Sequence, residues 1–268
     1  MRDVILRARA LGRFAVALFQ TSLASAMAQR GAFLMQVVLM AVNNAIFFTF
    51  WIALFQHVAT IRGYALSDIA VLYGVVAAAF GLSVVVAGGS RILGQYIHDG
   101  ELDSLLAQPK PTLYYAIGRR MVASGLGDIG SGIAMIALSG SVRLSTFPIV
   151  VFAIVSSATI CIATGILFNC VAFWFGRIET AARQLLEWLV TFSLYPDSLF
   201  GGAMRLVLFT LLPAGFVGYV PARLVRAPSL ATAGELALAA AVYAGVACWL
   251  FARGLRHYAA GSRFELAG

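Results

Sequence analysis

The chain has 268 residues, of which 61% are hydrophobic and 11% are charged. Because a soluble domain carries charge on about a quarter of its residues, this composition excludes an ordinary water-soluble protein. Mean hydropathy is +0.91, and several apolar runs approach the roughly 20 residues that cross a hydrocarbon core, so the sequence predicts an integral membrane protein. The net charge of +8 is typical of arginines that set membrane topology, and nucleic-acid binding is disfavoured.

Residues 1–30 predict an amphipathic helix that lies in the inner membrane interface. At helical spacing Arg2, Arg9, Arg13 and Gln20 fall on one side, and Val4, Leu11, Ala15 and Leu18 fall on the other. Arg7 interrupts this pattern. The arginines are spread along the segment instead of preceding an apolar block, so it does not resemble a cleaved signal peptide.

Apolar runs then predict six membrane spans in a single domain that covers 1–268. The spans lie at roughly 32–56, 68–90, 119–140, 147–175, 203–220 and 233–252. A further apolar stretch, 177–200, has only about 14 residues between Arg183 and Asp197, which is short for a crossing. We interpret it as an interfacial or half-membrane helix, and the alternative makes it a seventh crossing.

The distribution of basic residues favours six spans over seven. With a cytoplasmic N-terminus, six spans place 15 basic residues inside and leave four outside, namely Arg62, Arg143, Arg223 and Arg226. Seven spans give 13 inside and six outside. Since positive charge favours the cytoplasm, we expect six spans with both termini inside.

This topology places the loop 91–118 in the cytoplasm. The loop is long for a simple turn between neighbouring helices, and its stretch 97–111 holds Asp99, Glu101 and Asp103, three of only eleven acidic residues. A solvated connector is one reading of such a polar stretch.

Leucines at helical spacing favour the other reading, a short helix that docks on a partner protein. Asp99 is placed to cap its N-terminus, and Gly100 and Pro109 bound it. The leucines are Leu102, Leu105 and Leu106. Exposed apolar groups beside carboxylates are typical of an interaction surface.

The sequence predicts no enzyme and no bound metal or cofactor. A phosphate-binding loop needs lysine followed by serine or threonine, but the single lysine, Lys110, precedes Pro111. His57, His98 and His257 are far apart and lie in loops or tails. The three cysteines have no metal-binding spacing and are expected to be small buried apolar side chains: Cys161, Cys170 and Cys248.

Four polar side chains within the predicted spans are candidates for the transport pathway or for bonds between helices. Asp128 is an acid inside the third span, which by default suggests function. Its small neighbours, such as Gly125 and Gly132, equally suggest close helix packing. For Asn43, Asn44 and Asn169 interhelical hydrogen bonds are the favoured reading.

Motifs spread over nearly the whole chain resemble the type-2 ABC transporter permeases, in their bacterial six-span branch. GELDSLLAQPKP is similar to the G-x-L-D-x-L-L-x-x-P pattern that follows the second span in that family. FWFGRIE, YPDSLF, LLPAGFVGYVPA and RGLRHYAAGS match further segments. In the last of these the family often has Tyr-Glu-Ser, and Ala259 and Ala260 depart from it.

The resemblance implies an all-α membrane domain of the type V exporter-like kind in a bacterial inner membrane. Two permease subunits, identical or related, would form the pore, and a separate cytoplasmic ATPase carrying ATP and Mg²⁺ would bind each one. The helix in 97–111 would be the coupling helix, made of Asp99, Gly100, Glu101, Leu102, Asp103, Leu105, Leu106 and Pro109. The expected function is export of an amphipathic substrate. An ion-gradient transporter and a membrane-embedded enzyme are the alternatives.

Overall fold

The computed structural model describes the backbone of residues 2–142 and 144–265 and the side chains within 12–142 and 145–258. In this described part the secondary structure consists of helices joined by turns and loops, apart from one isolated bridge between Ile61 and Tyr64. The predicted all-α class is confirmed. Arg143 and Arg263, which entered the charge comparison, lie outside the residues with described side chains.

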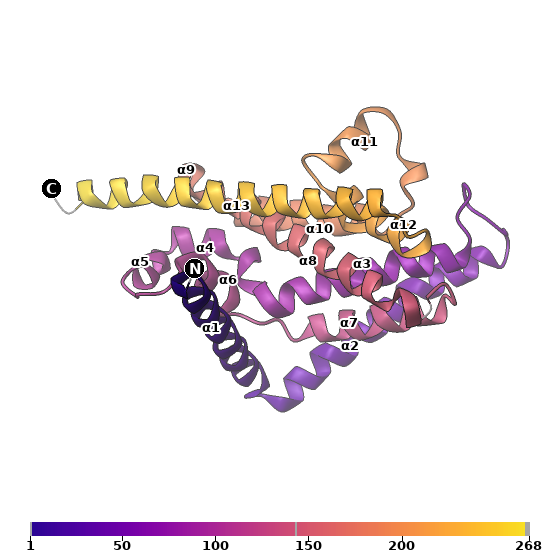
Figure 1. Ribbon diagram of the computed structural model, residues 1–268, viewed down its shortest axis with the longest axis horizontal. Coiled ribbons are helices and arrows are strands. Elements are labelled where there is room, and N and C mark those ends of the chain that lie inside the picture. Colours follow the sequence, from indigo (N-terminus) through magenta and orange to yellow (C-terminus); the bar gives the residue numbers. More distant parts are fainter. Residues whose placement is uncertain (1, 143, 266–268) are drawn as a thin grey trace.

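Four long helices form the frame of the molecule. They are α2 (Arg30–Phe55), α3 (Leu66–Ala87), α8 (Phe147–Cys170) and α13 (Leu230–Glu265). Together with the helical turns that extend them, they supply four stretches long and apolar enough to cross a membrane: Arg30–Phe55, Leu66–His98, Phe147–Phe175 and Leu230–Tyr258. These match the first, second, fourth and sixth predicted spans, and they run side by side along the long axis (Figure 1).

The two ends of this bundle differ. At one end, called the α5 end below, lie the short helices α4 (Leu93–His98), α5 (Glu101–Leu106) and α6 (Thr112–Gly118), with α9 (Ala172–Phe175) nearby (Figure 1). The opposite end holds the loop 57–65. The predicted loop 91–118 is therefore folded into three helices, where the sequence predicted one.

Helix α7 (Ser124–Leu138) corresponds to the third predicted span and packs between α2 and α3. It is shorter than the predicted 119–140. Gly81 on α3 and Gly125 on α7 allow the two backbones to touch, because a Cβ added at Gly125 would lie 2.6 Å from the carbonyl oxygen of Gly81. Small residues permit this kind of close approach between membrane helices.

The segment 177–197 runs from one end of the bundle to the other, which the half-membrane interpretation did not anticipate. Arg177 at its start donates a hydrogen bond of 2.7 Å to His98, at the α5 end. Asp197 at its finish accepts a hydrogen bond of 2.6 Å from Tyr64, at the opposite end. Between them α10 (Glu179–Ser193) packs against α3 and α8.

The predicted fifth span at 203–220 is wrong, because this stretch is not one helix. It consists of α11 (Gly202–Phe209), a turn through Pro213, the π-helical η4 (Gly215–Tyr219) and the start of α12 (Val220–Arg226). Proline cannot donate the hydrogen bond that would continue a helix through the turn. Arg226 at its end pairs with Asp68, so the segment 198–226 leaves the opposite end of the bundle and returns to it.

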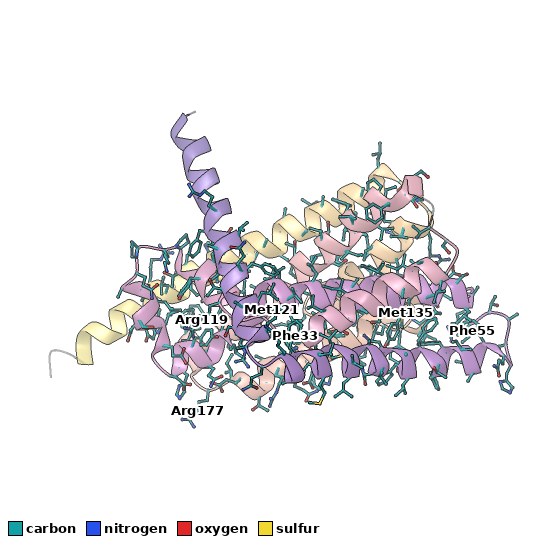
Figure 2. All side chains as sticks on the ribbon, turned by 90° about the horizontal axis from the view of Figure 1, so that it is seen from below. Phe33, Phe55, Arg119, Met121, Met135 and Arg177 are labelled. Carbon is teal, nitrogen blue, oxygen red and sulfur yellow. The ribbon has the colours of Figure 1, made fainter. Side chains whose placement is uncertain are left out.

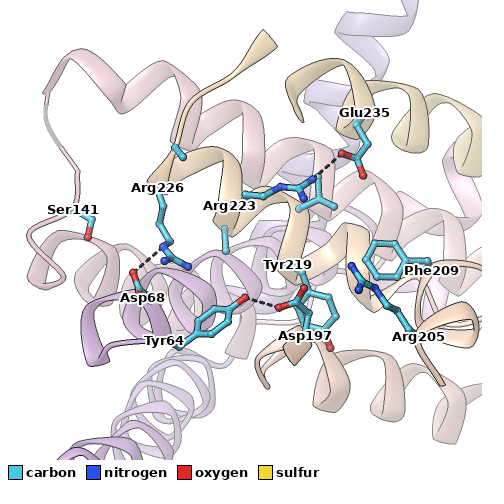
Figure 3. A pocket seen from close by; sticks show the side chains of 13 residues that line it. Tyr64, Asp68, Ser141, Asp197, Arg205, Phe209, Tyr219, Arg223, Arg226 and Glu235 are labelled. Carbon is cyan, nitrogen blue, oxygen red and sulfur yellow. Dashed lines mark hydrogen bonds and ion pairs between the residues drawn. The ribbon is translucent and has the colours of Figure 1, made fainter. Parts of the chain in front are cut away.

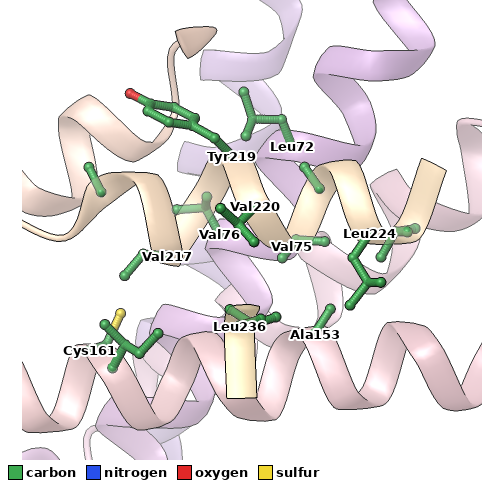
Figure 4. Close-up of a cluster of buried hydrophobic side chains, with 14 of the residues drawn as sticks. Leu72, Val75, Val76, Ala153, Cys161, Val217, Tyr219, Val220, Leu224 and Leu236 are labelled. Carbon is green, nitrogen blue, oxygen red and sulfur yellow. The ribbon is translucent and has the colours of Figure 1, made fainter. Parts of the chain in front are cut away.

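The segment 198–226 is apolar because it contributes to the core. Val217, Tyr219 and Val220 pack with Val76 of α3 and Leu236 of α13 in the largest cluster of buried side chains (Figure 4). The stretch 203–220 therefore resembles a membrane span in sequence because its residues are buried in the core, although the chain folds back on itself there.

Helix α1 (Arg2–Met27) stands away from the bundle at a steep angle to its long axis (Figure 2). Its C-terminal half is held to α6, because Ser22 Oγ donates a hydrogen bond of 2.8 Å to the carbonyl oxygen of Gly118. The predicted helix at 1–30 is thus present. Several side chains of its two proposed faces lie outside the described residues: Arg2, Val4, Arg7, Arg9 and Leu11.

Candidate functional site

The short helices at the α5 end are shaped by Gly100. This residue has φ of +73°, a conformation that glycine adopts at little cost, and it separates α4 from α5. Asp99 is the residue that ends α4, and its side chain does not cap α5, so the predicted N-cap is wrong. Helix α5 stops at Leu106, three residues before Pro109, within the range expected for a proline after a helix.

Two of the three leucines that were predicted to dock on a partner are buried in the chain itself. Leu102 is 0% exposed and Leu105 is 2% exposed. They pack with Tyr96, Ile97 and residues of α8, α9 and α13 in a cluster at the α5 end. The prediction that they fill a partner's groove is therefore wrong, because their side chains fasten α5 to the bundle.

Glu101 also has a partner within the chain. Its carboxylate pairs with Arg119, and the Arg119 guanidinium lies 3.9 Å from the centre of the Tyr96 ring. This internal contact links α5 to the end of α6.

What α5 offers to solvent is narrower than predicted. Asp99, Glu101, Asp103, Leu106 and Pro109 are exposed, with Leu106 38% exposed. The side chains that could meet another protein are therefore three carboxylates, one leucine and one proline on or beside a helix that is held rigidly from behind, and the Glu101 carboxylate is already paired with Arg119.

A polar cluster lies deep between α2 and α7. Asn44 donates hydrogen bonds of 2.7 Å to Asp128 Oδ1 and 2.8 Å to Ser131 Oγ. Asp128 is 4% exposed. The hydrogen bond between Asn44 and Asp128 joins two helices, as expected if these side chains serve helix packing. A role of Asp128 in the transport pathway stays a prediction.

The other two asparagines differ sharply from each other. Asn169 on α8 is 0% exposed; its Oδ1 accepts a hydrogen bond of 3.0 Å from the Gly94 amide, and its Nδ2 donates to the Ser90 carbonyl at 3.2 Å. It thus ties α8 to the bend between α3 and α4. Asn43 instead points away from the bundle and is exposed.

A pocket of about 570 Å³ at the opposite end was not anticipated from the sequence. Figure 3 shows that it is lined by charged groups from the start of α3, from the segment 197–205, from α12 and from α13, with Tyr64 from the loop before α3. Arg226 pairs with Asp68 at 2.7 Å, and Arg223 pairs with Glu235 at 2.8 Å. Burial, and then the hydrogen bond to Asp197, raise the pKa of Tyr64 well above its ordinary value.

Sequence reasoning used Arg223 and Arg226 only as topology markers. Glu235 lies twelve residues beyond Arg223, on the next helix. Asp68 lies far earlier in the chain, so no local spacing signals the pocket. The prediction that the cysteines are buried holds for Cys161 and Cys170 and is wrong for Cys248, which is exposed.

Comparison with protein families gives one match. A family described as "ABC-2 family transporter protein" matches residues 40–262. No curated protein and no solved structure matches the chain. Because the family match spans most of the sequence, from the middle of α2 to the end of α13, this chain belongs to the ABC-2 family of transporter proteins, as a multi-pass membrane permease.

Proposed function

We propose that this permease exports an amphipathic substrate with energy from a separate cytoplasmic ATPase that docks on the α5 end. The observation that carries the proposal is the construction of α5. Buried Leu102 and Leu105 and the Glu101–Arg119 pair fix the helix to α4, α6 and α8. A push on its exposed face would therefore be transmitted to the long helices and not lost in a flexible loop.

The proposed orientation places the α5 end in the cytoplasm. Arg91, Lys110, Arg119, Arg120 and Arg177 belong to the segments at or next to this end. The opposite end holds fewer basic residues, and two of them, Arg223 and Arg226, are neutralised by acidic partners within the chain. Positive charge favours the cytoplasmic side.

With that orientation we propose six crossings: α2, α3, α7, α8, α10 and α13. The segment 198–226 is a re-entrant element on the outer side, and both termini are cytoplasmic. Relative to the six spans expected from sequence, only Arg205 changes sides among the basic residues. Helix α1, which leaves the bundle at a steep angle, lies along the inner surface of a bacterial inner membrane (Figure 2).

A second permease subunit, identical or related, completes the pore in this proposal. The exposed face of α2 supports a partner there. Asn43 lies near the middle of this 26-residue helix and is exposed. Among the described residues its amide makes a single hydrogen bond, a long one of 3.9 Å to the Met40 sulfur. Because a polar side chain at the centre of a bilayer is costly, a facing subunit that accepts a hydrogen bond explains it better than lipid does.

Co-purification with an ABC ATPase subunit tests the proposal. We expect a stable complex that binds ATP and Mg²⁺ on the ATPase, and ATP hydrolysis stimulated by amphipathic candidate substrates in vesicles. Failure of any ATPase to associate, with transport that stops when an uncoupler collapses the ion gradient while ATP is kept constant, would overturn it in favour of an ion-gradient transporter.

A further inference from the structure

An apolar groove opens between α1 and α13 near the α5 end. Its volume is about 500 Å³, within the roughly 300–1,000 Å³ of pockets that hold small ligands. Helix α1 forms one wall through Gly12, Phe14 and Leu18, and α13 forms the facing wall through Ala244 and Cys248. The floor comes from α3, α6 and α8.

The groove is lined almost entirely by carbon. Ile162 and Ile166 of α8 and Val86 of α3 are typical of its lining, and two hydroxyls, from Thr159 and Tyr114, are present as well. The Thr159 hydroxyl already donates a hydrogen bond of 2.8 Å to the carbonyl oxygen of Val155. Such a lining offers water few hydrogen-bond partners. An apolar chain is therefore the occupant that suits the space.

One end of the groove is basic. The single lysine of the chain, Lys110, lies 5.8 Å from the ring centre of Phe14, which lines the groove, and 4.7 Å from that of Tyr115. The prolines on either side of Lys110 restrict its backbone. Positive charge beside an apolar slot complements a molecule with an anionic head and a hydrocarbon tail.

We propose that this groove holds an acyl chain of an anionic phospholipid from the surrounding membrane, with its phosphate paired to Lys110. The lipid completes the contact between α1 and the bundle, which within the described side chains depends on few groups, chiefly Leu18 and Ser22 against Gly118 and Phe14 against Tyr115. The lipid is a resident component and not the transported cargo. The proposal needs only that the α5 end lies at a membrane surface, so it stands apart from the proposed ATPase coupling.

Photocrosslinking tests the proposal. The full chain is reconstituted in vesicles of equal parts phosphatidylcholine and phosphatidylglycerol, with the diazirine probe on the acyl chain of either lipid. We expect the phosphatidylglycerol probe to label peptides that contain Thr159–Ile166 and Ala244–Cys248 in preference to the peptide with Ile133 and Leu138 of α7, which are exposed and do not line the groove. Lys110→Gln should reduce the preference for phosphatidylglycerol over phosphatidylcholine by about fivefold, as expected for one basic side chain near a membrane surface, whereas Lys110→Arg should retain it.

Filling the groove supplies the second arm. Gly12→Trp places a large ring on α1 where an added Cβ meets no atom within 4 Å, and Ala244→Trp fills the groove from α13. Both should abolish labelling of the groove peptides. Val246→Trp is the matched control, because Val246 is 45% exposed on the same helix and does not line the groove. Equal labelling in wild type and in both groove-filling variants, or labelling by the phosphatidylcholine probe that matches phosphatidylglycerol, would overturn the proposal.

Discussion

Asn44 on α2 and Asp128 on α7 are joined by a hydrogen bond of 2.7 Å inside the helix bundle. The same amide nitrogen reaches Ser131, one turn further along α7, at 2.8 Å. Asp128 Oδ2 is buried and has no hydrogen-bond partner in the described part of the chain. One oxygen of the Asp128 carboxyl group thus holds two helices together, while the other can still accept a further hydrogen bond.

Removing this bond should destabilise the α2–α7 contact. We expect Asn44→Ala and Asp128→Ala each to lower stability, with a coupling energy of about 0.5–2 kcal/mol in a double-mutant cycle, the range for hydrogen bonds between membrane helices. Reversible unfolding in mixed micelles measures it. Thr49→Ala is the control on α2, because Thr49 is exposed and bonds only to the helix's own Ala45 carbonyl in the described contacts.

Asp128→Asn separates packing from a pathway role, since asparagine keeps an acceptor oxygen for Asn44. If packing is the role of Asp128, the variant should be inserted normally and transport at the wild-type rate per molecule. Loss of transport at unchanged abundance and stability would instead assign Asp128 to the pathway.

Cysteine labelling should place the two ends of α10 on opposite sides of the membrane. In a chain freed of its native cysteines, we expect an impermeant thiol reagent added outside to modify Leu199→Cys, which is 44% exposed in the wild-type chain, and to miss Thr180→Cys. Leu230→Cys, at a residue that is 93% exposed, should be modified from outside as well. If Leu199→Cys is not modified from outside, 177–200 is a half-membrane helix. If Leu230→Cys alone is not modified, the chain has seven crossings.

Substitutions of exposed residues on α5 should weaken binding of the ATPase, whereas substitutions of its buried residues should destabilise the fold. Leu106→Ala should weaken association with the ATPase without altering the fold, because Leu106 is exposed. Asp103→Asn should weaken it by at most about 1 kcal/mol, and the loss should shrink in high salt, as for surface ion pairs. Binding of the purified ATPase to reconstituted permease measures both.

Leu102→Ala should act differently, because it empties a buried site and costs about 2–5 kcal/mol of local stability. Hydrogen exchange over 93–118 should then accelerate, whereas Leu106→Ala should leave it unchanged. If Leu106→Ala and Asp103→Asn together leave the ATPase bound and transport intact, the α5 helix is only a connector.

The phenol of Tyr64 should remain un-ionised in alkaline solution. Its pKa is raised by burial and by the carboxylate of Asp197, so folding favours the neutral form. Its contribution to stability is complete below the ordinary tyrosine pKa of about 10 and is lost only as pH rises through the higher folded value. Tyr64→Phe should therefore leave the tyrosinate absorbance unchanged up to about pH 11.

A lower tyrosinate absorbance in Tyr64→Phe than in the wild-type chain at that pH would contradict the Tyr64–Asp197 contact.

The sequence by itself determined that the chain is a helical membrane protein and where its four longest helices lie. The length of an apolar run is a property of the sequence alone, and a run of more than 20 apolar residues has few alternatives to a membrane helix. The position of the polar loop 91–118, its glycine at Gly100 and the family resemblance were also available from the sequence, because they depend on local residue types and their spacing.

Only the tertiary structure decided which of two shorter apolar segments crosses the bundle. The segments 177–200 and 203–220 have similar length and character, and their paths depend on distant partners, such as His98 for Arg177 and Tyr64 for Asp197. The same limit applies to α5. Helical spacing places Leu102, Leu105 and Leu106 near one another, but whether a leucine meets its own chain or a partner depends on the helices packed behind it, and these come from parts of the sequence up to about 150 residues away.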